Sequence, residues 1–562
     1  MTAVNPMEFY KDLLKKKVAD AYALAVKDGA LPEADIVDFD VEVPKERANG
    51  EFSTNFSMKN VKLLKKAPFM IGNEIVTRID KGEFISDVCV AGPGFINFKM
   101  SPVYYASLVD NILSLGDNFG KTDTYGGKSY LVEFVSANPT GPMHMGNARG
   151  GIIGDCLSSV LSWAGADVKK EFYVNDAGNQ VMLFGESLYT RLYQLVNGED
   201  SIEFPDDGYH GDDIKVLAKE FCDINGAEIL NDTKEAVVEK LVAFGLEKNI
   251  ARMQSDLEKY KIVYDKWFRE STLHKSGYVA ETIELLEKAG ALYENEGAKW
   301  FRATDYGCEK DEVMVKANGF YTYYAVDLAY HRNKFVERNF ENCINVLGAD
   351  HHGHTIRYKA GMKALGIDPD RLQVVLMQLV RLMRDGEVVR MSKRTGKSIT
   401  LSDLLDEIPT DAARFFFNMN RCESVMDFDL SLAVKQDSDN PLYYVQYAHA
   451  RICSILRTLE TDPASVSGCN GYDYNTDAEK ELISALSSFP CEVLYAADNF
   501  EPSRITKYVI DVASAFHKFY NACRIKGEAD DVVNARLALV VSAKTVIKNA
   551  LTLMNIEAPE KM

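Results

Sequence analysis

The clearest pattern in the chain is an apolar run followed by a helical pattern, with a polar turn between them. Residues 130–135 are almost all apolar, as in a central strand of a parallel sheet. Residues 148–163 carry apolar side chains at helical spacing until Gly165 ends the pattern. Residues 168–174 then indicate a second strand. This order predicts a strand–helix–strand unit whose first turn lies at the carboxyl edge of a parallel sheet, where α/β proteins bind ligands.

The same patterns divide the chain into three parts. Residues 1–118 begin with a helical pattern and continue in short alternating segments, which predicts a small α/β domain. Residues 119–411 contain the strand–helix–strand unit and predict a larger α/β domain, interrupted at about 192–295 by a helical insertion. Strand signals vanish after this part, and residues 412–562 predict an all-helical bundle.

The turn between the first strand and its helix has the composition of a nucleotide-binding turn. Pro139 and Gly141 fix an irregular loop, and Gly146 leaves room for a base or ribose beside the backbone. His144 precedes the helix start, where unpaired N–H groups and the helix dipole favour phosphate. The glycine signatures of dinucleotide-binding and Walker-type turns do not occur here. The turn therefore predicts an ATP site.

A second signal is the cationic, glycine-containing segment at residues 389–398. Adenylate formation depends on aligning a carboxylate with the α-phosphate and on cations that stabilise the developing phosphate charge. Lys393 is the natural candidate for such a cation. A basic loop by itself is more often a solvated turn, so this interpretation depends on its pairing with the His144 turn.

These two segments resemble the HIGH and KMSKS motifs of class I aminoacyl-tRNA synthetases, and the chain resembles the bacterial arginyl-tRNA synthetase family nearly from end to end. Two departures stand out. Asn147 occupies the place of the second histidine of HIGH. Arg390 and Arg394 replace the first lysine and the last serine of KMSKS, while the central Lys393 is intact. Further matching segments lie at residues 41–45, 50–55, 91–98, 175–180, 348–354 and 439–451.

The resemblance implies a class I Rossmann-like catalytic domain with a parallel sheet, a small α/β N-terminal domain that contacts tRNA, and an all-α bundle that receives the anticodon arm. It implies ATP-dependent activation of L-arginine to arginyl-adenylate and transfer to tRNA(Arg), with release of AMP and diphosphate. His144 and Lys393 would be catalytic. The residues expected to bind ATP are Pro139, Gly141, His144, Gly146, Asn147, Asp350, His351, His354, Met391, Ser392 and Lys393.

An arginine substrate also agrees with the residues themselves. A guanidinium is a planar, permanently charged fork of donors, so its pocket needs carboxylates and a flat neighbour. Glu133 and Asp327 can supply the charge and Tyr323 the flat wall, although Glu133 can equally meet a structural Lys or Arg. The residues expected to bind arginine are Glu133, Ser136, Asn138, Tyr323, Asp327 and His351, and those expected to bind tRNA are Asn55, Tyr443, Gln446, His449 and Arg451.

Three histidines within residues 351–354 raise the possibility of a metal site. A structural zinc site needs four ligands at regular spacing, yet the sequence has no C-x-x-C, and Cys308 and Cys343 lie at no suitable interval. We therefore predict no dedicated metal site and expect Mg²⁺ to accompany ATP as part of the substrate.

The composition and charge of the chain limit which kinds of partner it can have. The 562 residues are 46% hydrophobic and 26% charged, as in soluble multidomain proteins, and the ten scattered cysteines suit a reducing compartment. A net charge of −19 argues against general nucleic-acid binding, but residues 357–397 hold ten Lys and Arg against four Asp and Glu. We expect a cytoplasmic monomer with tRNA(Arg), L-arginine and ATP as partners, and neither DNA nor a membrane.

Two alternatives remain open at this point. One is another HIGH-type nucleotidyltransferase, or a synthetase for a different amino acid, which would lack a guanidinium pocket or an anticodon bundle. The other is a noncatalytic tRNA-binding paralogue, which should have lost His144 or Lys393, and this chain retains both.

Overall fold

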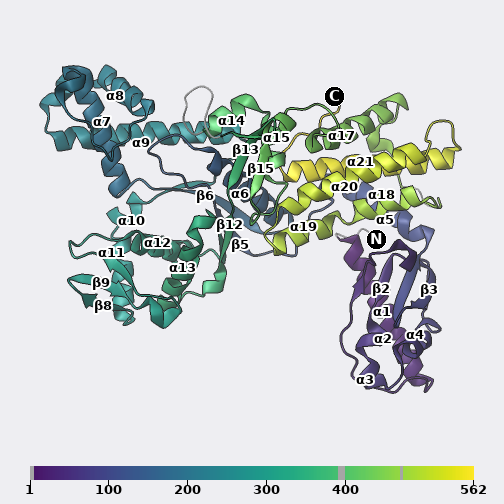
Figure 1. Cartoon of the computed structure of the whole chain (residues 1–562). Helices are drawn as coiled ribbons and strands as arrows, with labels where there is room; N and C mark the ends of the chain where they lie inside the picture. Colours follow the sequence, from purple (N-terminus) through teal and green to yellow (C-terminus); the bar gives the residue numbers. More distant parts are fainter. Residues whose placement is uncertain (1–4, 390–398, 469–471) are drawn as a thin grey trace. The chain divides into compact units, whose positions relative to one another are not determined.

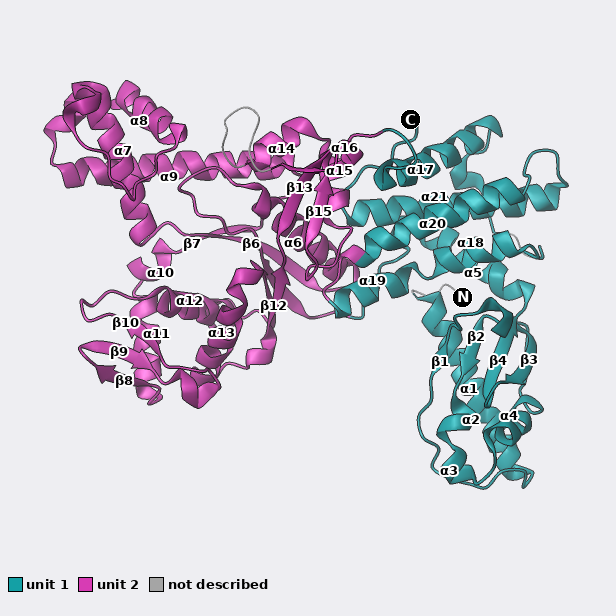
Figure 2. Ribbon diagram, in the orientation of Figure 1, with its two compact units in different colours: residues 1–124, 436–499, 504–562 teal, residues 125–435, 500–503 magenta. Residues whose placement is uncertain are grey.

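The computed structural model describes residues 5–389, 399–468 and 472–562 (Figure 1). The chain forms two compact units (Figure 2). Unit 1 comprises residues 1–124, 436–499 and 504–562, and unit 2 comprises residues 125–435 and 500–503. Among the described residues, no helix combines the length and the apolar character needed to cross a membrane.

Unit 2 is built on a five-stranded, fully parallel sheet with the order β12-β11-β5-β6-β7. Because β6 follows β5 on one side and β11 lies on the other, the strand order reverses at β5, and crevices at such points bind ligands in α/β proteins. The strands predicted at residues 130–135 and 168–174 are confirmed as β5 and β6. The bounds are β5 Ser129–Glu133, β6 Asp167–Val174, β7 Lys266–Arg269, β11 Asn342–Gly348 and β12 Leu372–Met377.

Helix α6 (Met145–Trp163) confirms the helix predicted after β5. It packs unusually close to the end of this strand because Gly154 has no side chain: a Cβ there would collide with the ring of Phe134. Phe134 itself is fully buried. The close packing holds the first turn of α6 directly beside the carboxyl ends of the strands.

The predicted insertion at about 192–295 is helical only in part. Helices α7 (Asn179–Asn197), α8 (Asp212–Asn225) and α9 (Lys234–Lys259) form a helical module around their own apolar core. The next segment returns to the central sheet as β7, which the sequence pattern had assigned to a helix. The reason is packing between distant residues, since Trp267 of β7 stacks on Phe172 of β6 with ring centroids 4.2 Å apart.

The rest of unit 2 adds two small sheets and several helices. One is the antiparallel sheet β10-β9-β8, and the other is β14-β13-β15. β15 lies beyond residue 412, where no strand was expected, because it pairs in parallel with the distant strand β13. The bounds are β8 Leu292–Asn295, β9 Ala298–Phe301, β10 Glu312–Val315, β13 Val380–Arg384, β14 Glu387–Val389, β15 Met426–Asp429, α10 Ser271–Lys275, α11 Tyr278–Lys288, α12 Tyr323–Arg332, α13 His352–Ala364, α14 Leu401–Glu407, α15 Thr410–Phe417 and α16 Leu430–Ala433.

Unit 1 contains both an α/β part and the predicted helical bundle. The α/β part is an antiparallel sheet of order β1-β2-β4-β3 with α1 to α4, and α5 lies with the bundle helices. Asn549 of α21 donates to the carbonyls of Gly116 and Phe119, just after α5. The bounds are α1 Pro6–Lys27, β1 Val41–Glu42, β2 Phe52–Thr54, α2 Phe56–Lys59, α3 Val61–Leu64, α4 Pro68–Val76, β3 Ile85–Ala91, β4 Phe95–Met100, α5 Pro102–Leu115, α17 Pro441–Thr458, α18 Asp477–Ser487, α19 Phe489–Asp498, α20 Ser503–Ala522 and α21 Asp530–Leu553.

Candidate functional site

A cavity of about 1130 Å³ opens in unit 2 at the carboxyl ends of β5, β11 and β12. It lies at the point where the strand order reverses. Of the residues predicted to bind ATP or arginine, Ser136, Asn138, Gly141, His144, Gly146, Asn147, Asp350 and His351 line it. The structure places Glu133, Pro139, Tyr323, Asp327 and His354 outside the lining that the described residues form. Met391, Ser392 and Lys393 lie outside the described residues.

His144 and Asn147 cap the start of α6 reciprocally. The Nδ1 atom of His144 accepts the N–H of Gly146 at 3.1 Å, and Oδ1 of Asn147 accepts the N–H of His144 at 3.1 Å. Asn147 therefore has a structural reason to stand where HIGH has histidine. A Cβ at Gly146 would lie 2.9 Å from Cε1 of the His144 ring, so a side chain there would displace the ring.

This capping fixes the chemistry of the His144 ring. Burial lowers the pKa of His144, so the ring is neutral at pH 7. With Nδ1 accepting a hydrogen bond, the proton lies on Nε2, and the ring can donate to a ligand from that atom.

The His144 turn is also held by the segment that follows residues 390–398. The N–H of Met145 donates to the carbonyl of Ile399 at 3.1 Å, and the N–H of Leu401 donates to the carbonyl of Met143 at 2.9 Å. Between them, Thr400 caps α14 and forms a reciprocal pair with Asp403. Backbone hydrogen bonds thus join the His144 turn to residues 399–401, which directly follow the second segment singled out in the sequence.

The connection from β5 to the turn is strained. Val135 has φ 68° and Ser136 has φ 43°, in the left-handed region that a β-branched residue rarely adopts. Such strain persists only where the surroundings fix it, and it concentrates at functional sites. Here the Ser136 hydroxyl donates to Oε1 of Glu133 at 3.1 Å and accepts the N–H of Tyr173 at 3.1 Å.

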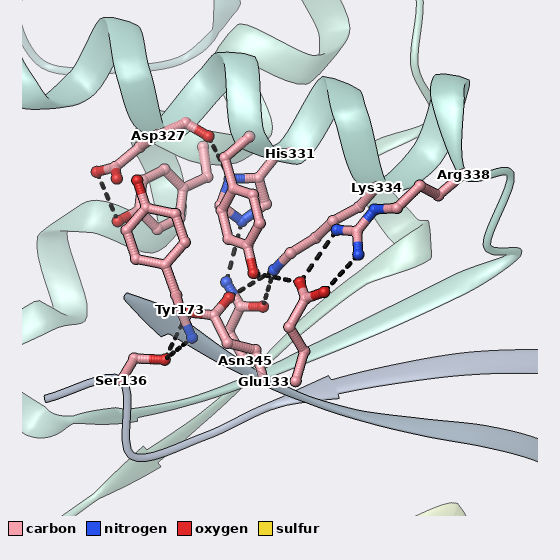
Figure 3. Close-up of polar contacts among 11 residues, drawn as sticks. Glu133, Ser136, Tyr173, Asp327, His331, Lys334, Arg338 and Asn345 are labelled. Carbon is pink, nitrogen blue, oxygen red and sulfur yellow. Dashed lines mark hydrogen bonds and ion pairs between the residues drawn. The ribbon is translucent and has the colours of Figure 1, made fainter. Parts of the chain in front are cut away.

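A buried polar network connects Glu133, at the carboxyl end of β5, with α12 and the residues that follow it (Figure 3). Lys334 is fully buried, and its Nζ donates to Oε2 of Glu133 at 2.5 Å and to Oδ1 of Asn345 at 3.0 Å. The Nδ2 of Asn345 donates to Nε2 of His331 at 3.0 Å, and Nδ1 of His331 donates to the carbonyl of Asp327 at 2.7 Å. Burial lowers the pKa of His331 to about 3, so its ring is neutral. The structure thus gives Glu133 an internal lysine partner.

Asp327 and Glu270 form a second, cation-poor cluster. Burial raises the pKa of each carboxyl group to about 7, and the charge of Glu270 adds to the rise at Asp327. Tyr358 donates to Asp327 at 3.1 Å and Tyr173 to Glu270 at 2.9 Å. Within the described part of the chain, no Lys or Arg pairs with either carboxylate, although His274 lies 3.5 Å from Glu270. The cluster can therefore receive a cation.

Tyr323 begins α12, one helical turn before Asp327, and its side chain is 58% exposed. The ring is therefore available to a ligand on the same helix face as Asp327. His354 lies beside His351 with ring centroids 4.9 Å apart. The described residues include no group of three or more His, Cys, Asp or Glu placed to hold a metal ion.

The residues predicted to bind tRNA all lie in unit 1, and they differ in whether their side chains are already engaged within the protein. Gln446 and His449 are occupied internally: the Gln446 amide donates to the carbonyl of Glu557 at 2.9 Å, and buried His449 donates to that of Pro559 at 2.9 Å. Tyr443 stacks in parallel on Tyr447, with ring centroids 6.3 Å apart. Asn55 exchanges hydrogen bonds with Asp40 and lines a cavity of about 300 Å³.

Arg451 lies in a different setting, on the rim of a basic cavity of about 880 Å³. Its guanidinium covers the ring of Tyr520 at 4.2 Å. Arg524 and Lys526 line the same cavity. His449 is thus buried and bonded within the protein, whereas Arg451 lines a basic cavity; direct RNA contact by either residue stays a prediction.

Sequence reasoning missed several site residues because only the fold brings them together. Glu270 and Lys334 follow β7 and α12, far from the motifs, and no local pattern marks them. Arg149 is one turn into α6 and fully buried, where it donates to the carbonyls of Gln378, Arg421 and Ser424. Tyr209, His210 and Gly211, before α8, and Asp213 in its first turn line the same large cavity as the His144 turn. The one signal available in the sequence was the presence of an arginine inside the HIGH-like helix.

Comparison with known proteins agrees with this geometry. The chain matches the arginyl tRNA synthetase N-terminal domain over residues 8–100, the catalytic domain of class I (R) tRNA synthetases over 108–437 and the DALR anticodon binding domain over 445–562. It is 51% identical to an arginine–tRNA ligase of Ruminiclostridium cellulolyticum over 98% of both chains, and 49% identical to that of Acetivibrio thermocellus over 99% and 100%. The Thermus thermophilus arginyl-tRNA synthetase shares the fold, with a TM-score of 0.74 at 22% identity over 98% and 100% of the two chains.

Proposed function

The chain belongs to the arginyl-tRNA synthetase family, and from this premise we propose how its residues divide the work of an arginine–tRNA ligase. The enzyme uses ATP to activate L-arginine as arginyl-adenylate, and then transfers the arginine to tRNA(Arg). In the first step the arginine carboxylate attacks the α-phosphorus, and the bond to the departing diphosphate breaks. In the second step a ribose hydroxyl of the tRNA attacks the carbonyl carbon, and AMP leaves.

We propose that the large cavity of unit 2 holds ATP. The observation that carries this proposal is the neutral His144 ring at the start of α6, which lines the cavity and whose Nε2–H can donate to a ligand there. Gly141, Gly146 and Asn147 would shape the same wall, and Asp350 and His351 the opposite one. Pro139 and His354 do not line the cavity that the described residues form, and they would support the residues that do. Met391, Ser392 and Lys393 would contact the phosphates, with Lys393 stabilising the charge that develops on them.

Mg²⁺ would enter this site with the triphosphate. The described residues offer no three-ligand set of His, Cys, Asp or Glu, so the ion would be held chiefly by phosphate oxygens. Its charge would offset that of the phosphates.

We propose that Asp327 and Glu270 carry the charge that recognises the guanidinium. The pKa of each carboxyl group is raised because burial removes water from the charged form, and at Asp327 the charge of Glu270 adds to the rise. A bound guanidinium would offset both effects. Tyr323 would cover its flat face. Glu133 is already neutralised by Lys334, so it would contribute a hydrogen-bond acceptor, and Ser136, Asn138 and His351 would contact the amino-acid head from the cavity wall.

In unit 1 we propose that Tyr443, Tyr447 and Arg451 meet unpaired bases of the anticodon arm, by stacking and by cation–π contact. Gln446 and His449 would act indirectly, by holding the segment near Glu557 against α17. Asn55 would contact tRNA from the N-terminal part of the chain. We further propose that the enzyme works as a monomer in the cytoplasm, which suits the nine free cysteines of the described residues.

The test is pyrophosphate exchange with tRNA(Arg) present, measured for single variants. Asp327→Asn keeps the shape and removes the charge, so the arginine KM should rise while the ATP KM stays near that of the wild type. Lys393→Ala should instead lower the rate of adenylation, because it removes about 3–4 kcal/mol of transition-state stabilisation. His144→Ala should lower the same rate, whereas His352→Ala, an exposed histidine on α13, is the matched control. Equal kinetics for Asp327→Asn and the wild type would contradict the arginine assignment.

A further inference from the structure

The helical module α7–α9 contributes a wall to the nucleotide cavity. The cavity lining shared with the His144 turn includes Tyr209, His210 and Gly211 from the connection between α7 and α8, and Asp213 from the first turn of α8. Asp213 also approaches the backbone of Gly141, since a Cβ there would lie 3.9 Å from its carboxylate. The module is therefore part of the site, although it has a core of its own.

One buried side chain ties this module to the turn. Asn249 of α9 is only 5% exposed, and its Nδ2 donates to the carbonyl of Pro139 at 2.9 Å. Along the chain, Pro139 follows the strained residues Val135 and Ser136 and precedes the capping residue His144. The hydrogen bond thus reaches the middle of the loop whose end presents the His144 ring to the cavity.

The loop needs such an external restraint. Two successive non-glycine residues in the left-handed region are strained, and this conformation persists only if contacts around it fix it. At the far end the loop is fixed by Met143 and Met145, which bond to the segment 399–401. Between the strained start and this far end, Asn249 supplies a hydrogen bond from another element.

The end of α9 is anchored independently of Asn249. Arg414 donates to the carbonyl of Tyr260 at 2.9 Å, and the hydroxyl of Tyr264 donates to the carbonyl of Phe134 at 3.1 Å. Lys261 pairs with Asp411 at 2.7 Å. Loss of the Asn249 amide would therefore leave the helix in place and release the loop.

We propose that Asn249 is a positioning residue for adenylate formation, which holds the Pro139 loop so that His144 meets the α-phosphate. This inference rests on the proposed role of the His144 turn in binding ATP. Asn249 itself touches the loop backbone and acts through it. A displacement of a reacting group by about 1 Å can cost about a hundredfold in rate.

The experiment compares Asn249→Ala with Asn225→Ala by pyrophosphate exchange in the presence of tRNA(Arg). Asn225 belongs to the same module, and its amide donates to the carbonyl of Phe221, also at 2.9 Å, but away from the loop. We expect Asn249→Ala to lower kcat by roughly ten- to a hundredfold with an arginine KM close to that of the wild type. Asn225→Ala should retain wild-type kcat.

A second measurement separates positioning from folding. Amide hydrogen exchange should be faster at Thr140, Gly141 and Met143 in Asn249→Ala, with protection of α9 and β5 unchanged. If the alanine variant does not fold, Asn249→Asp keeps the shape of the side chain without its N–H donors and serves in its place. Wild-type kcat and loop protection would overturn the inference, as would a loss of kcat that Asn225→Ala shares. If His144→Ala catalysed pyrophosphate exchange at the wild-type rate, the proposed role of His144 would fail, and the inference about Asn249 would fail with it.

Discussion

Single residues in this site carry charges that are almost completely removed from water. Lys334 and Glu133 neutralise each other, and Asn345 supplies a further acceptor to the ammonium group. Asp327 and Glu270 have no such cation within the described residues and hold their protons more tightly instead. The two arrangements predict different responses to mutation and to pH.

Lys334→Met should strongly destabilise unit 2. The substitution leaves Glu133 buried and unpaired, and breaking a buried ion pair in this way typically costs about 3–5 kcal/mol. Denaturant unfolding followed by circular dichroism checks the prediction. Lys219→Met is the control, because its pair with Asp223 is exposed and should contribute little. Equal unfolding midpoints for the two variants would show that the buried pair is dispensable.

Arginine affinity should fall as the pH decreases below about 7. The pKa values of Asp327 and Glu270 are raised to about 7 by burial, so below that pH the carboxylates gain protons while the guanidinium keeps its charge. The arginine KM should therefore rise toward acid pH, and less steeply in Asp327→Asn. A KM in the wild type that does not change between pH 8 and pH 6 would argue against these carboxylates as the recognition site.

The same raised pKa values affect the stability of the free enzyme. Their contribution is fully present below the unfolded pKa values of about 4 and is lost as the pH rises through about 7. Bound arginine should restore part of that loss.

At the residue scale, the sequence was informative where chemistry is local. His144, Gly146 and the turn around them were predicted because the residues that act together are neighbours in the chain. Glu270 and Lys334 were missed because their partners come from other strands and helices. Glu133 shows the limit most clearly: the sequence left open whether it meets a ligand or a lysine, and only the fold identifies Lys334.

Among the elements, α6 connects the sheet to the site. Its N-terminal turn presents His144, its middle packs on β5 at Gly154, and Arg149 bonds to three carbonyls from later in the chain. The position of this helix therefore sets that of the His144 turn.

Gly154→Ala should destabilise the catalytic sheet, even though alanine favours helices. The added methyl group would collide with Phe134, and such overpacking costs about 1–3 kcal/mol. Thermal unfolding of the variant tests this. Gly353→Ala on α13 is the matched control, because nothing lies within 4 Å of its added Cβ, and it should leave stability unchanged or raise it by up to about 1 kcal/mol. The same shift for both substitutions would contradict close packing at Gly154.

Elements with strong local periodicity were predicted well, and short strands were not. β5, α6 and β6 each follow from runs of at least six residues in the sequence. β7 and β15 have only four residues each, and they become strands because β6 and β13 offer them partners. Pairing between distant segments overrides a weak local preference.

On the scale of the whole molecule, charge is unevenly distributed. The net charge is −19, yet Arg451, Arg524 and Lys526 gather at one cavity of unit 1. In the proposed mode of tRNA binding, this cavity provides one local area of attraction on a chain of net negative charge.

Arg524→Ala should weaken tRNA binding and reduce its dependence on salt. Loss of one phosphate contact to single-stranded RNA lowers the slope of log K against log salt by about 0.7. Filter binding at several salt concentrations gives this slope. Lys507→Ala, an exposed lysine on the same helix as Tyr520, should leave it unchanged. An unaltered slope for Arg524→Ala would remove this cavity from the RNA-binding surface.

Unit 1 is assembled from the two ends of the chain, and this has a consequence for synthesis on the ribosome. The Asn549 amide and the Gly116 carbonyl that it contacts are 433 residues apart in the sequence. Translation proceeds at about 5–20 residues per second, so roughly 20–90 s separate the emergence of α5 from that of its partner α21. Throughout that interval the apolar face of α5 lacks its native cover, while unit 2 can already fold. Completion of unit 1 must therefore wait for the synthesis of α21, and until then the nascent chain carries a face of α5 that lacks this helix.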